Sequence, residues 1–323
     1  MQYPLAVYTD VDDIDPEPGA RLLREAGFTV ARADSRDPDV IADVATGAIA
    51  LLAGYAPVDA ALLDRLSDLR IVSLLSNGSD NVDIDAATER GIWVCAVGDA
   101  ASEEVAVHAW TLSLAMIRRL DFFLRVGPVA GWLDRPDDAP RRLSDLTVGV
   151  LGLGTIGSRF ARLATSGAGR VIALDRRGDR EPIPGVTTVE TLDELLSVSD
   201  VLGVFLPLSD STRGLLDAAA LARMPHGAHL VNVSRGPIVD TAALVEALDT
   251  GRLAGAAVDV FDAEPPGPDD PLVRHPKVIA TPHVGYLSDA TVTAYVERQA
   301  RSVLTWYADG VPERAINTPK VKA

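Results

Sequence analysis

Residues 147–157 read Thr-Val-Gly-Val-Leu-Gly-Leu-Gly-Thr-Ile-Gly, and they contain the most informative motif of the chain. The apolar run at 147–151 is typical of a buried parallel strand, and it leads directly into a Gly-x-Gly-x-x-Gly turn. Apolar residues then recur on one face of a helix, at Ile156, Phe160, Leu163 and Ala164. A strand, a glycine-rich turn and an amphipathic helix in this order predict a dinucleotide-binding unit, whose glycines let the backbone approach a pyrophosphate at the helix N-terminus.

The next strand bears on the choice of dinucleotide. Residues 170–174, Arg-Val-Ile-Ala-Leu, are strand-like and lead into Asp175, an acid about 20 residues beyond the glycines. A carboxylate at this place accepts hydrogen bonds from the ribose hydroxyls and repels the 2′-phosphate of NADP, so we expect NAD. Arg176 and Arg177 follow at once, and arginines there can hold that phosphate, so use of NADP stays open.

Outside this unit, short apolar runs alternate with helical segments along the chain. The alternation predicts an α/β fold with doubly wound parallel sheets, and 323 residues are enough for two domains. Residues 102–125 read as one long helix with apolar positions nearly all round, which predicts a buried crossing between the domains. In the first hundred residues, strands are expected near 5–9, 29–32, 49–53, 70–74 and 92–95.

Three polar residues follow later predicted strands. Arg235, Glu264 and His283 come just after the runs 229–233, 254–261 and 277–280, respectively. The carboxyl ends of parallel strands share one edge of the sheet, where open α/β folds bind ligands, so we expect these side chains beside the glycine turn. A guanidinium can hold a carboxylate, an imidazole can transfer a proton, and a carboxylate can orient that imidazole and favour its charged form.

At these residues the sequence resembles a known family. The segments 231–236 (Val-Asn-Val-Ser-Arg-Gly), 255–265 and 281–285 (Thr-Pro-His-Val-Gly) are similar to three signature stretches of the D-isomer-specific 2-hydroxyacid dehydrogenases, and the likeness spans nearly the whole chain. Within that family it is similar to phosphoglycerate and glycerate dehydrogenases, with some similarity to the C-terminal-binding-protein branch. Val107 departs from the pattern, because the family often has an acid there.

The resemblance implies two Rossmann-like domains. An NAD-binding domain, residues 101–287, would be inserted into a flavodoxin-like substrate domain formed by residues 1–100 and 288–323. The helices at 102–125 and near 291–304 would be the two crossings, and the cleft would close over substrate and exclude water. The implied activity is hydride transfer between nicotinamide and C2 of a small 2-keto or D-2-hydroxy acid. This acid is the small-molecule partner that we expect besides the cofactor.

The same resemblance assigns roles to individual residues. Arg235 would hold the substrate carboxylate and polarise the C2 carbonyl, while His283, paired with Glu264, would be the acid/base. The substrate carboxylate would also meet the backbone N–H groups of Asn77, Gly78 and Ser79. Asp259 would anchor the nicotinamide carboxamide. The full set of implied cofactor contacts is Gly152, Gly154, Thr155, Ile156, Gly157, Asp175, Leu206, Pro207, Thr212, Val233, Asp259, His283 and Gly285.

The remaining histidines are weaker candidates for a functional role. His108 lies within the long apolar helix, and the other three lie at turns or strand starts: His226, His229 and His275. No spacing of histidines or acids suggests a metal site, so none is expected.

The substrate is less sharply indicated, and two other functions stay open. The loop 52–57, Leu-Ala-Gly-Tyr-Ala-Pro, is apolar where phosphoglycerate-type members tend to place an arginine, which favours glyoxylate, hydroxypyruvate, pyruvate or a bulkier apolar 2-keto acid. Glu264 argues against the formate branch, which has Gln there. The alternatives are an NAD(H)-sensing regulatory protein of the same fold and a phosphite-type dehydrogenase.

Composition limits the partners. With 46 acidic and 30 basic residues the net charge is −16, which disfavours nucleic acid and anionic membrane surfaces. The N-terminus, with three aspartates among residues 10–13, does not read as a secretory leader, and no apolar run is of membrane-spanning length. Together with the single cysteine, Cys95, these features favour a cytoplasmic protein. By resemblance alone, we expect a homodimer.

Overall fold

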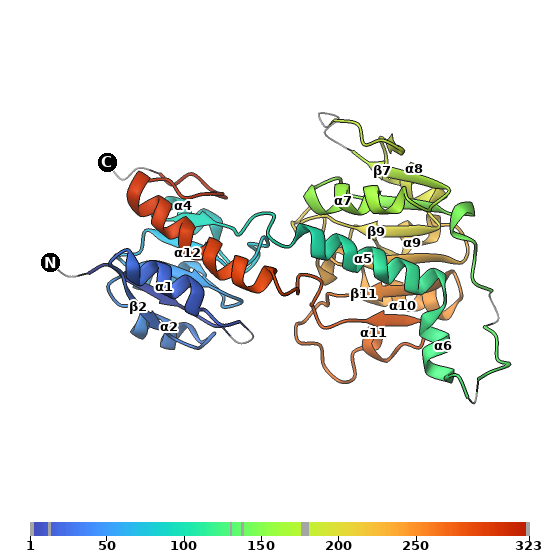
Figure 1. Cartoon of the computed structure of the whole chain (residues 1–323), viewed down its shortest axis with the longest axis horizontal. Coiled ribbons are helices and arrows are strands. Elements are labelled where there is room, and N and C mark those ends of the chain that lie inside the picture. Colours follow the sequence, from blue (N-terminus) through green and yellow to red (C-terminus); the bar gives the residue numbers. More distant parts are fainter. Residues whose placement is uncertain (1–2, 12–13, 130, 137–138, 176–180, 321–323) are drawn as a thin grey trace. The chain divides into compact units, whose positions relative to one another are not determined.

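The computed structural model describes residues 3–11, 14–129, 131–136, 139–175 and 181–320, and the chain divides into two compact units (Figure 1). Unit 1 comprises residues 1–100 and 287–323, and unit 2 comprises residues 101–286. Unit 2 is therefore inserted into unit 1. The chain returns to unit 1 at residue 287, one residue before the boundary expected from the sequence.

Unit 1 is built on a five-stranded sheet in which every pairing is parallel, with strand order β2-β1-β3-β4-β5. This is the flavodoxin-like order, so the fold expected for this part is confirmed. Its strands are β1 (Leu5–Tyr8), β2 (Thr29–Arg32), β3 (Ala48–Ala53), β4 (Ile71–Leu74) and β5 (Trp93–Cys95). Its helices are α1 (Glu17–Glu25), α2 (Pro38–Val44), α3 (Ala60–Arg65), α4 (Ile84–Glu89) and α12 (Thr291–Asp309).

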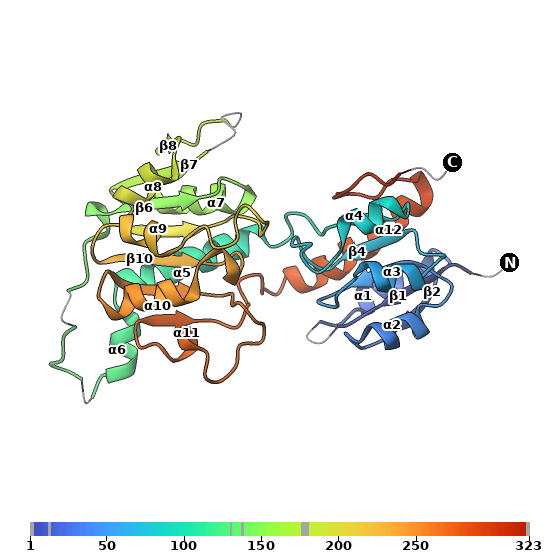
Figure 2. The same cartoon turned by 180° about the vertical axis from the view of Figure 1, so that it is seen from behind.

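Helices cover both faces of this sheet (Figures 1 and 2). On one face, Leu23 of α1 and Val303 of α12 pack in a core cluster with the side chain of Tyr8. On the other face, Ile41 of α2 and Leu62 of α3 belong to a second cluster. Both faces are buried, which explains why these strands read as continuous apolar runs rather than as an alternation.

Unit 2 is built on a seven-stranded parallel sheet with strand order β12-β11-β10-β9-β6-β7-β8. Apart from β12, this is the Rossmann order, so the expected fold is confirmed here too. Its strands are β6 (Thr147–Leu151), β7 (Arg170–Leu174), β8 (Val186–Val189), β9 (Val201–Val204), β10 (Ala228–Asn232), β11 (Leu253–Val258) and β12 (Val278–Ala280). Its α-helices are α5 (Ser102–Ile117), α6 (Leu120–Val126), α7 (Thr155–Ala164), α8 (Leu192–Val198), α9 (Ala218–Arg223), α10 (Thr241–Asp249) and α11 (Pro271–Arg274).

The two faces of this sheet also carry separate cores. Helices α5 and α7 lie on the face seen in Figure 1, where Met116 and Phe160 belong to one buried cluster. Helices α8 to α11 lie on the face seen in Figure 2, where Leu221 and Leu244 belong to another. The order of strands reverses between β6 and β9, and this switch point is where open α/β sheets bind ligands.

The expected single helix over 102–125 is wrong. Helix α5 ends at Ile117, and α6 begins at Leu120 after Arg119 adopts a left-handed conformation with φ +54°. The Arg119 side chain pairs with Asp121 at 3.3 Å. No glycine or proline marks this break, so the apolar periodicity runs on through it in the sequence. The other expected crossing, α12, lies wholly within unit 1.

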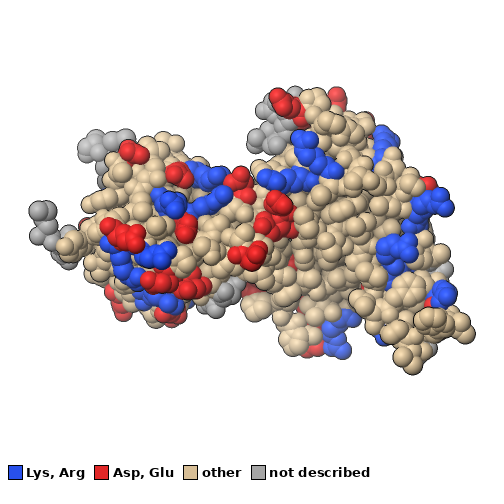
Figure 3. Space-filling model, viewed as in Figure 1, with Lys and Arg blue, Asp and Glu red and all other residues tan. Residues whose placement is uncertain are grey.

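The surface is mixed in charge on the face drawn in Figure 3, where basic and acidic side chains are interspersed. Within the described residues, no helix combines the length and the apolar character that crossing a membrane requires.

Candidate active site

The glycine turn after β6 has the geometry that a dinucleotide pyrophosphate needs. Gly152 has φ +104°, and an added Cβ there would lie 2.8 Å from the Phe205 carbonyl oxygen. An added Cβ on Gly157 would lie within 2 Å of the Gly152 carbonyl oxygen, so this glycine lets α7 pack closely on the turn. An added Cβ on Gly154 meets open space, and no side chain caps α7 there. The N-terminus of α7 is thus open to an anion.

The neighbouring strands place the other expected cofactor contacts at the same edge. Asp175 follows β7, which pairs with β6 throughout its length. Leu206 follows β9, and its Cδ2 would lie 3.0 Å from a Cβ added at Gly152. The Thr212 hydroxyl donates to the Pro207 carbonyl oxygen at 2.7 Å and fixes that loop. Arg176 and Arg177, on which NADP use depends, lie outside the described residues.

Arg235 follows β10, in a turn held by its neighbours. Asn232, which is buried, donates from Nδ2 to the Arg235 carbonyl oxygen at 2.9 Å. The Ser234 hydroxyl donates to the Val204 carbonyl oxygen at 2.6 Å. A Cβ on Gly236 would collide with the backbone of Phe261, so the turn packs directly on the segment after β11. Val233 packs at the edge of the core beneath the turn.

Glu264 joins this turn to His283. Its Oε1 accepts from the Phe261 N–H at 3.0 Å, and its Oε2 accepts from His283 Nδ1 at 2.6 Å. Burial raises the pKa of the Glu264 carboxyl, but the hydrogen bond and charge of His283, the Phe261 N–H and the Arg235 charge together lower it below its ordinary value. Glu264 is therefore ionised near neutral pH, between an imidazole and a guanidinium.

The segment that carries His283 is held by Asp259, directly after β11. His283 has φ +52°, a left-handed conformation that costs a residue other than glycine about 1 kcal/mol or more. On the next two residues, the Val284 N–H donates to Asp259 Oδ1 at 3.0 Å and the Gly285 N–H donates to Oδ2 at 2.8 Å. Asp259 is buried, so these bonds replace the water that its carboxylate lost on folding.

The three residues expected to bind the substrate carboxylate from the other domain lie in unit 1. Asn77, Gly78 and Ser79 form the turn after β4, and the Ser76 hydroxyl donates to the Gly78 carbonyl oxygen at 2.6 Å. Asn81 donates from Nδ2 to the Gly54 and Ala56 carbonyl oxygens, at 3.1 and 3.0 Å. The turn is thereby tied to the segment after β3, which lies beside β4 in the sheet.

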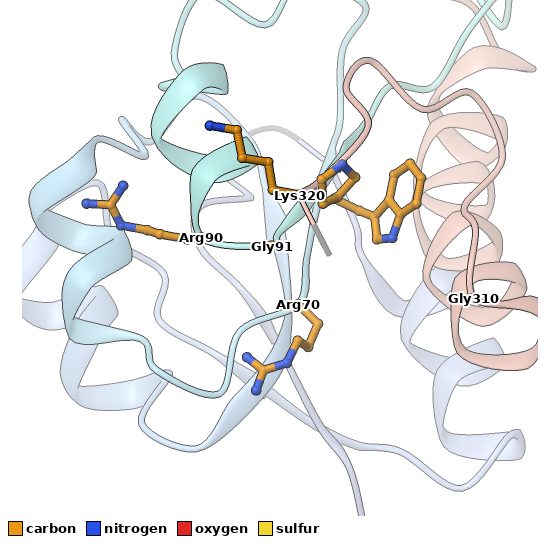
Figure 4. Close-up of a pocket in the computed structure, with 7 residues that line it drawn as sticks. Arg70, Arg90, Gly91, Gly310 and Lys320 are labelled. Atoms are coloured by element: carbon orange, nitrogen blue, oxygen red, sulfur yellow. The ribbon is translucent and has the colours of Figure 1, made fainter. Parts of the chain in front are cut away.

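A pocket of about 460 Å³ lies elsewhere in unit 1, at the amino ends of β4 and β5 (Figure 4). Arg90 in its wall pairs with Asp64 at 2.7 Å, and Lys320 lies 3.5 Å from Glu89. Figure 4 shows the side chains of Arg70, Arg90 and Lys320 extending in different directions. The pocket therefore does not gather its positive charges on one point.

Two residues near the unit 2 edge were not singled out by the sequence. Asn232 stands within the Val-Asn-Val-Ser-Arg-Gly segment, where a polar residue at the end of a buried strand was an available signal. His108, placed by the sequence only within an apolar helix, has Nε2 at 3.1 Å from the Thr281 hydroxyl and 3.5 Å from Asp259 Oδ1. His275, for which the sequence showed no partner pattern, has Nε2 at 3.3 Å from Asp249 Oδ1. No group of three or more acids, histidines or cysteines in the described chain could hold a metal ion.

Sequence comparison identifies relatives of this chain. The family model of the D-isomer specific 2-hydroxyacid dehydrogenase NAD binding domain matches residues 110–285. A glyoxylate reductase of Aeropyrum pernix is 34% identical over 98% of this chain and 92% of its own length. The glyoxylate/hydroxypyruvate reductase B of Escherichia coli is 34% identical over 82% of this chain and 84% of its own length.

Comparison of structures agrees. The crystal structure of an NADPH-dependent glyoxylate/hydroxypyruvate reductase from Sinorhizobium meliloti, in complex with NADP and malonate, superposes with a TM-score of 0.86 at 31% identity and covers all of both chains. The chain therefore belongs to the D-isomer specific 2-hydroxyacid dehydrogenases, NAD-dependent oxidoreductases that act on the CH–OH group of 2-hydroxy acids.

Proposed function

We propose that this chain reduces glyoxylate, hydroxypyruvate or a similarly small 2-keto acid to the D-2-hydroxy acid, with His283 as the acid. The observation that carries the proposal is the 2.6 Å hydrogen bond from His283 Nδ1 to the ionised Glu264, with the Arg235 charge beside it. A carboxylate at Nδ1 leaves Nε2 as the nitrogen that exchanges a proton with substrate.

The described residues define what the protein contributes. The Arg235 guanidinium binds the substrate carboxylate and draws electron density from the C2 carbonyl. Bound NADH supplies the hydride that adds to C2. As the C2–O π pair moves to oxygen, His283 gives its Nε2 proton to that oxygen and becomes neutral, while Glu264 keeps the ring oriented. In the oxidative direction the same nitrogen takes the proton back.

For the cofactor we propose the contacts of the unit 2 edge. The N-terminus of α7 and the turn at Gly152, Gly154, Thr155, Ile156 and Gly157 would hold the pyrophosphate, and Asp175 would accept the ribose hydroxyls. Leu206, Pro207, Thr212, Val233 and Gly285 would line the path toward the nicotinamide. Asp259 would meet the carboxamide. In unit 1, we retain Asn77, Gly78 and Ser79 as backbone donors to the substrate carboxylate.

The substrate class is supported by the relatives and by the loop after β3. Reductases of glyoxylate and hydroxypyruvate are among the matched proteins. The loop 54–56 places Tyr55 at the carboxyl edge of unit 1, with the Arg36 guanidinium 4.9 Å from its ring centroid and paired with Asp10 at 3.3 Å. Arg36 is a cation that the loop sequence alone did not reveal, but its carboxylate partner already offsets its charge.

A panel assay tests this proposal. The purified chain is mixed with NADH and glyoxylate, hydroxypyruvate, pyruvate or 3-phosphohydroxypyruvate, and loss of absorbance at 340 nm is followed. We expect turnover with the first two, the highest kcat/KM with one of them, and D-lactate from any pyruvate reduced, identified by chiral chromatography. Absence of turnover with every 2-keto acid, or preference for the phosphorylated one, would contradict the proposal.

We also propose a homodimer formed through unit 2. Five large apolar residues of α6 and the following turn are exposed, and we call them the α6 patch: Leu120, Leu124, Val129, Trp132 and Leu133. Three of them, Leu120, Leu124 and Trp132, line one groove together with the partly buried Phe123. Leu124, Trp132 and Leu133 are 79%, 73% and 82% exposed, which is unusual for three large apolar residues so close in sequence. A second copy of the chain would cover them.

We place the protein in the cytoplasm. Cys95 is its single cysteine, and its thiol is buried, which raises its pKa to about 11 and keeps it unreactive. The proposed substrates and NAD are metabolites of the reducing cytosol.

A further inference from the structure

A chain of hydrogen bonds in unit 2 connects α5 to the segment that carries His283. His108 Nε2 lies 3.1 Å from the Thr281 hydroxyl oxygen, and that hydroxyl lies 2.6 Å from Asp259 Oδ1. Asp259 in turn accepts from the N–H groups of Val284 and Gly285. The chain thus ends on the two residues that follow His283.

The hydrogens that these groups carry determine which one donates in each hydrogen bond. Burial raises the pKa of the Asp259 carboxyl, but hydrogen bonds from His108, Thr281, Val284 and Gly285 together lower it below its ordinary value, so Asp259 is an ionised acceptor. The Thr281 hydroxyl has one hydrogen, and the short bond to Asp259 uses it. The Thr281 oxygen is therefore an acceptor toward His108, so His108 must carry a proton on Nε2.

Packing shows that the His283 segment depends on this arrangement. An added Cβ on Gly285 would lie 2.9 Å from Asp259 Oδ2 and 3.3 Å from His108 Cδ2, so the segment lies directly against both side chains. The left-handed backbone of His283 is unfavourable by itself and persists only where its surroundings hold it. A carboxylate free to rotate would hold the Val284 and Gly285 N–H groups less firmly.

We propose that His108 and Thr281 are positioning residues for proton transfer. The His108 Nε2–H orients the Thr281 hydroxyl, the hydroxyl orients Asp259, and Asp259 holds the segment in which His283 faces Glu264. This deepens the proposed function, because it rests on His283 as the proton donor. It also makes Asp259 a clamp on the protein's own backbone, in addition to any contact with the nicotinamide.

Paired substitutions at Thr281 separate the hydroxyl from the shape of the side chain. Thr281→Val removes the hydroxyl at nearly constant volume, and Thr281→Ser keeps it. We expect Thr281→Val to lower kcat by about 10- to 100-fold with a change in KM below about threefold, and Thr281→Ser to restore most of the loss. The matched control is Thr250→Val, which removes a 2.8 Å bond from a threonine hydroxyl to the Glu246 carbonyl oxygen at the end of α10 and should leave kcat unchanged.

The second measurement needs no turnover. Long-range ¹H–¹⁵N NMR spectra of the protein without cofactor report which ring nitrogen of each histidine carries a proton. We expect Nε2–H for His108 and Nδ1–H for His283 in the wild type and in Thr281→Ser. In Thr281→Val, both signals should shift or broaden. His275→Gln, which alters the histidine–aspartate pair at the opposite end of β12 from Thr281, is the control and should leave both signals in place.

The outcomes are distinct. A His108 ring protonated only at Nδ1, or wild-type kcat and an unchanged His283 signal in Thr281→Val, would overturn the proposal. If Thr281→Val fails to fold, His108→Leu against His108→Gln provides the same comparison, because only Gln keeps an N–H donor. A fully active His283→Ala variant would instead defeat the proposed function, while the predicted state of His108 would still be decided by NMR.

Discussion

Glu264 accepts a 2.6 Å hydrogen bond from His283 while also binding the backbone N–H of Phe261. The carboxylate is therefore fixed at one end to the segment after β11 and at the other to the imidazole. The positive charge of Arg235 also lowers the pKa of Glu264. The Glu264 carboxylate therefore interacts both with His283, which can donate a proton, and with Arg235, which can bind the carboxylate of a substrate.

His283→Ala should lower kcat by about 10²- to 10⁴-fold, the range typical of removing a general acid. The reason is that the His283 imidazole gives its proton to the substrate oxygen in the proposed mechanism, and the Ala side chain has no proton to give. Steady-state kinetics with glyoxylate and NADH measures the loss. His226→Ala, an exposed histidine in a turn of the same unit, is the control. A variant at position 283 with wild-type kcat would refute the role.

Glu264→Gln should lower kcat by about 10- to 100-fold and leave the affinity for NADH unchanged. Gln keeps the size and an acceptor oxygen but carries no charge to stabilise the protonated imidazole. Steady-state kinetics gives kcat, and quenching of protein fluorescence gives the NADH Kd. Glu246→Gln, on the exposed side of α10, should behave as the wild type. A Glu264→Gln variant with normal kcat would show that the pair is structural only.

Asp175→Ser should reduce the preference for NADH by about tenfold or more. The carboxylate after β7 repels a 2′-phosphate and accepts ribose hydroxyls, and Ser does neither as strongly. The ratio of kcat/KM for NADH to that for NADPH measures the change, with Asp269→Ser, an exposed acid, as control. Wild-type enzyme that uses NADPH as well as NADH would remove the basis of this prediction.

The proposed homodimer depends on the α6 patch. Leu124→Glu combined with Trp132→Glu should convert a dimer to a monomer, because charges on a buried apolar interface are strongly unfavourable. Light scattering after size-exclusion chromatography gives the mass in solution. Val311→Glu, at an apolar position of unit 1 that is 52% exposed, should leave the mass unchanged. A wild-type monomer, or a double variant that stays dimeric, would contradict the proposed interface.

The sequence predicted the two sheets and the unit 2 edge because their signals are local. Parallel strands bring their carboxyl ends to one edge, so residues just after successive strands, such as Arg235 and Glu264, could be placed near one another without coordinates. The break at Arg119 could not be predicted, because a left-handed arginine leaves no mark in composition. His108 was missed since its partner Thr281 lies 173 residues away in the chain, and only the folded sheet brings α5 beside that segment.

The buried imidazole of His229 should make the folded protein less stable in acid. It is buried at the start of β10, and its Nε2 has no hydrogen-bond partner among the described residues. Burial, and next the positive charge of Arg119, lower its pKa from 6.5 to about 4, against the smaller opposing effects of Asp121 and Asp200. The unfolded chain takes up this proton first as the pH falls, so the free energy of unfolding decreases between about pH 6.5 and pH 4.

His229→Leu should remove this sensitivity, since Leu fills the site without a titratable group. Between pH 7 and pH 5 the wild type should lose roughly 2 kcal/mol more stability than the variant. Urea unfolding at the two pH values, followed by circular dichroism, measures the difference. His226→Leu, at an exposed turn, should keep the wild-type pH dependence. Equal losses in the wild type and in His229→Leu would contradict the lowered pKa of His229, because the carboxyls of Asp259 and Glu264, whose pKa values are also lowered, change stability only at more acidic pH.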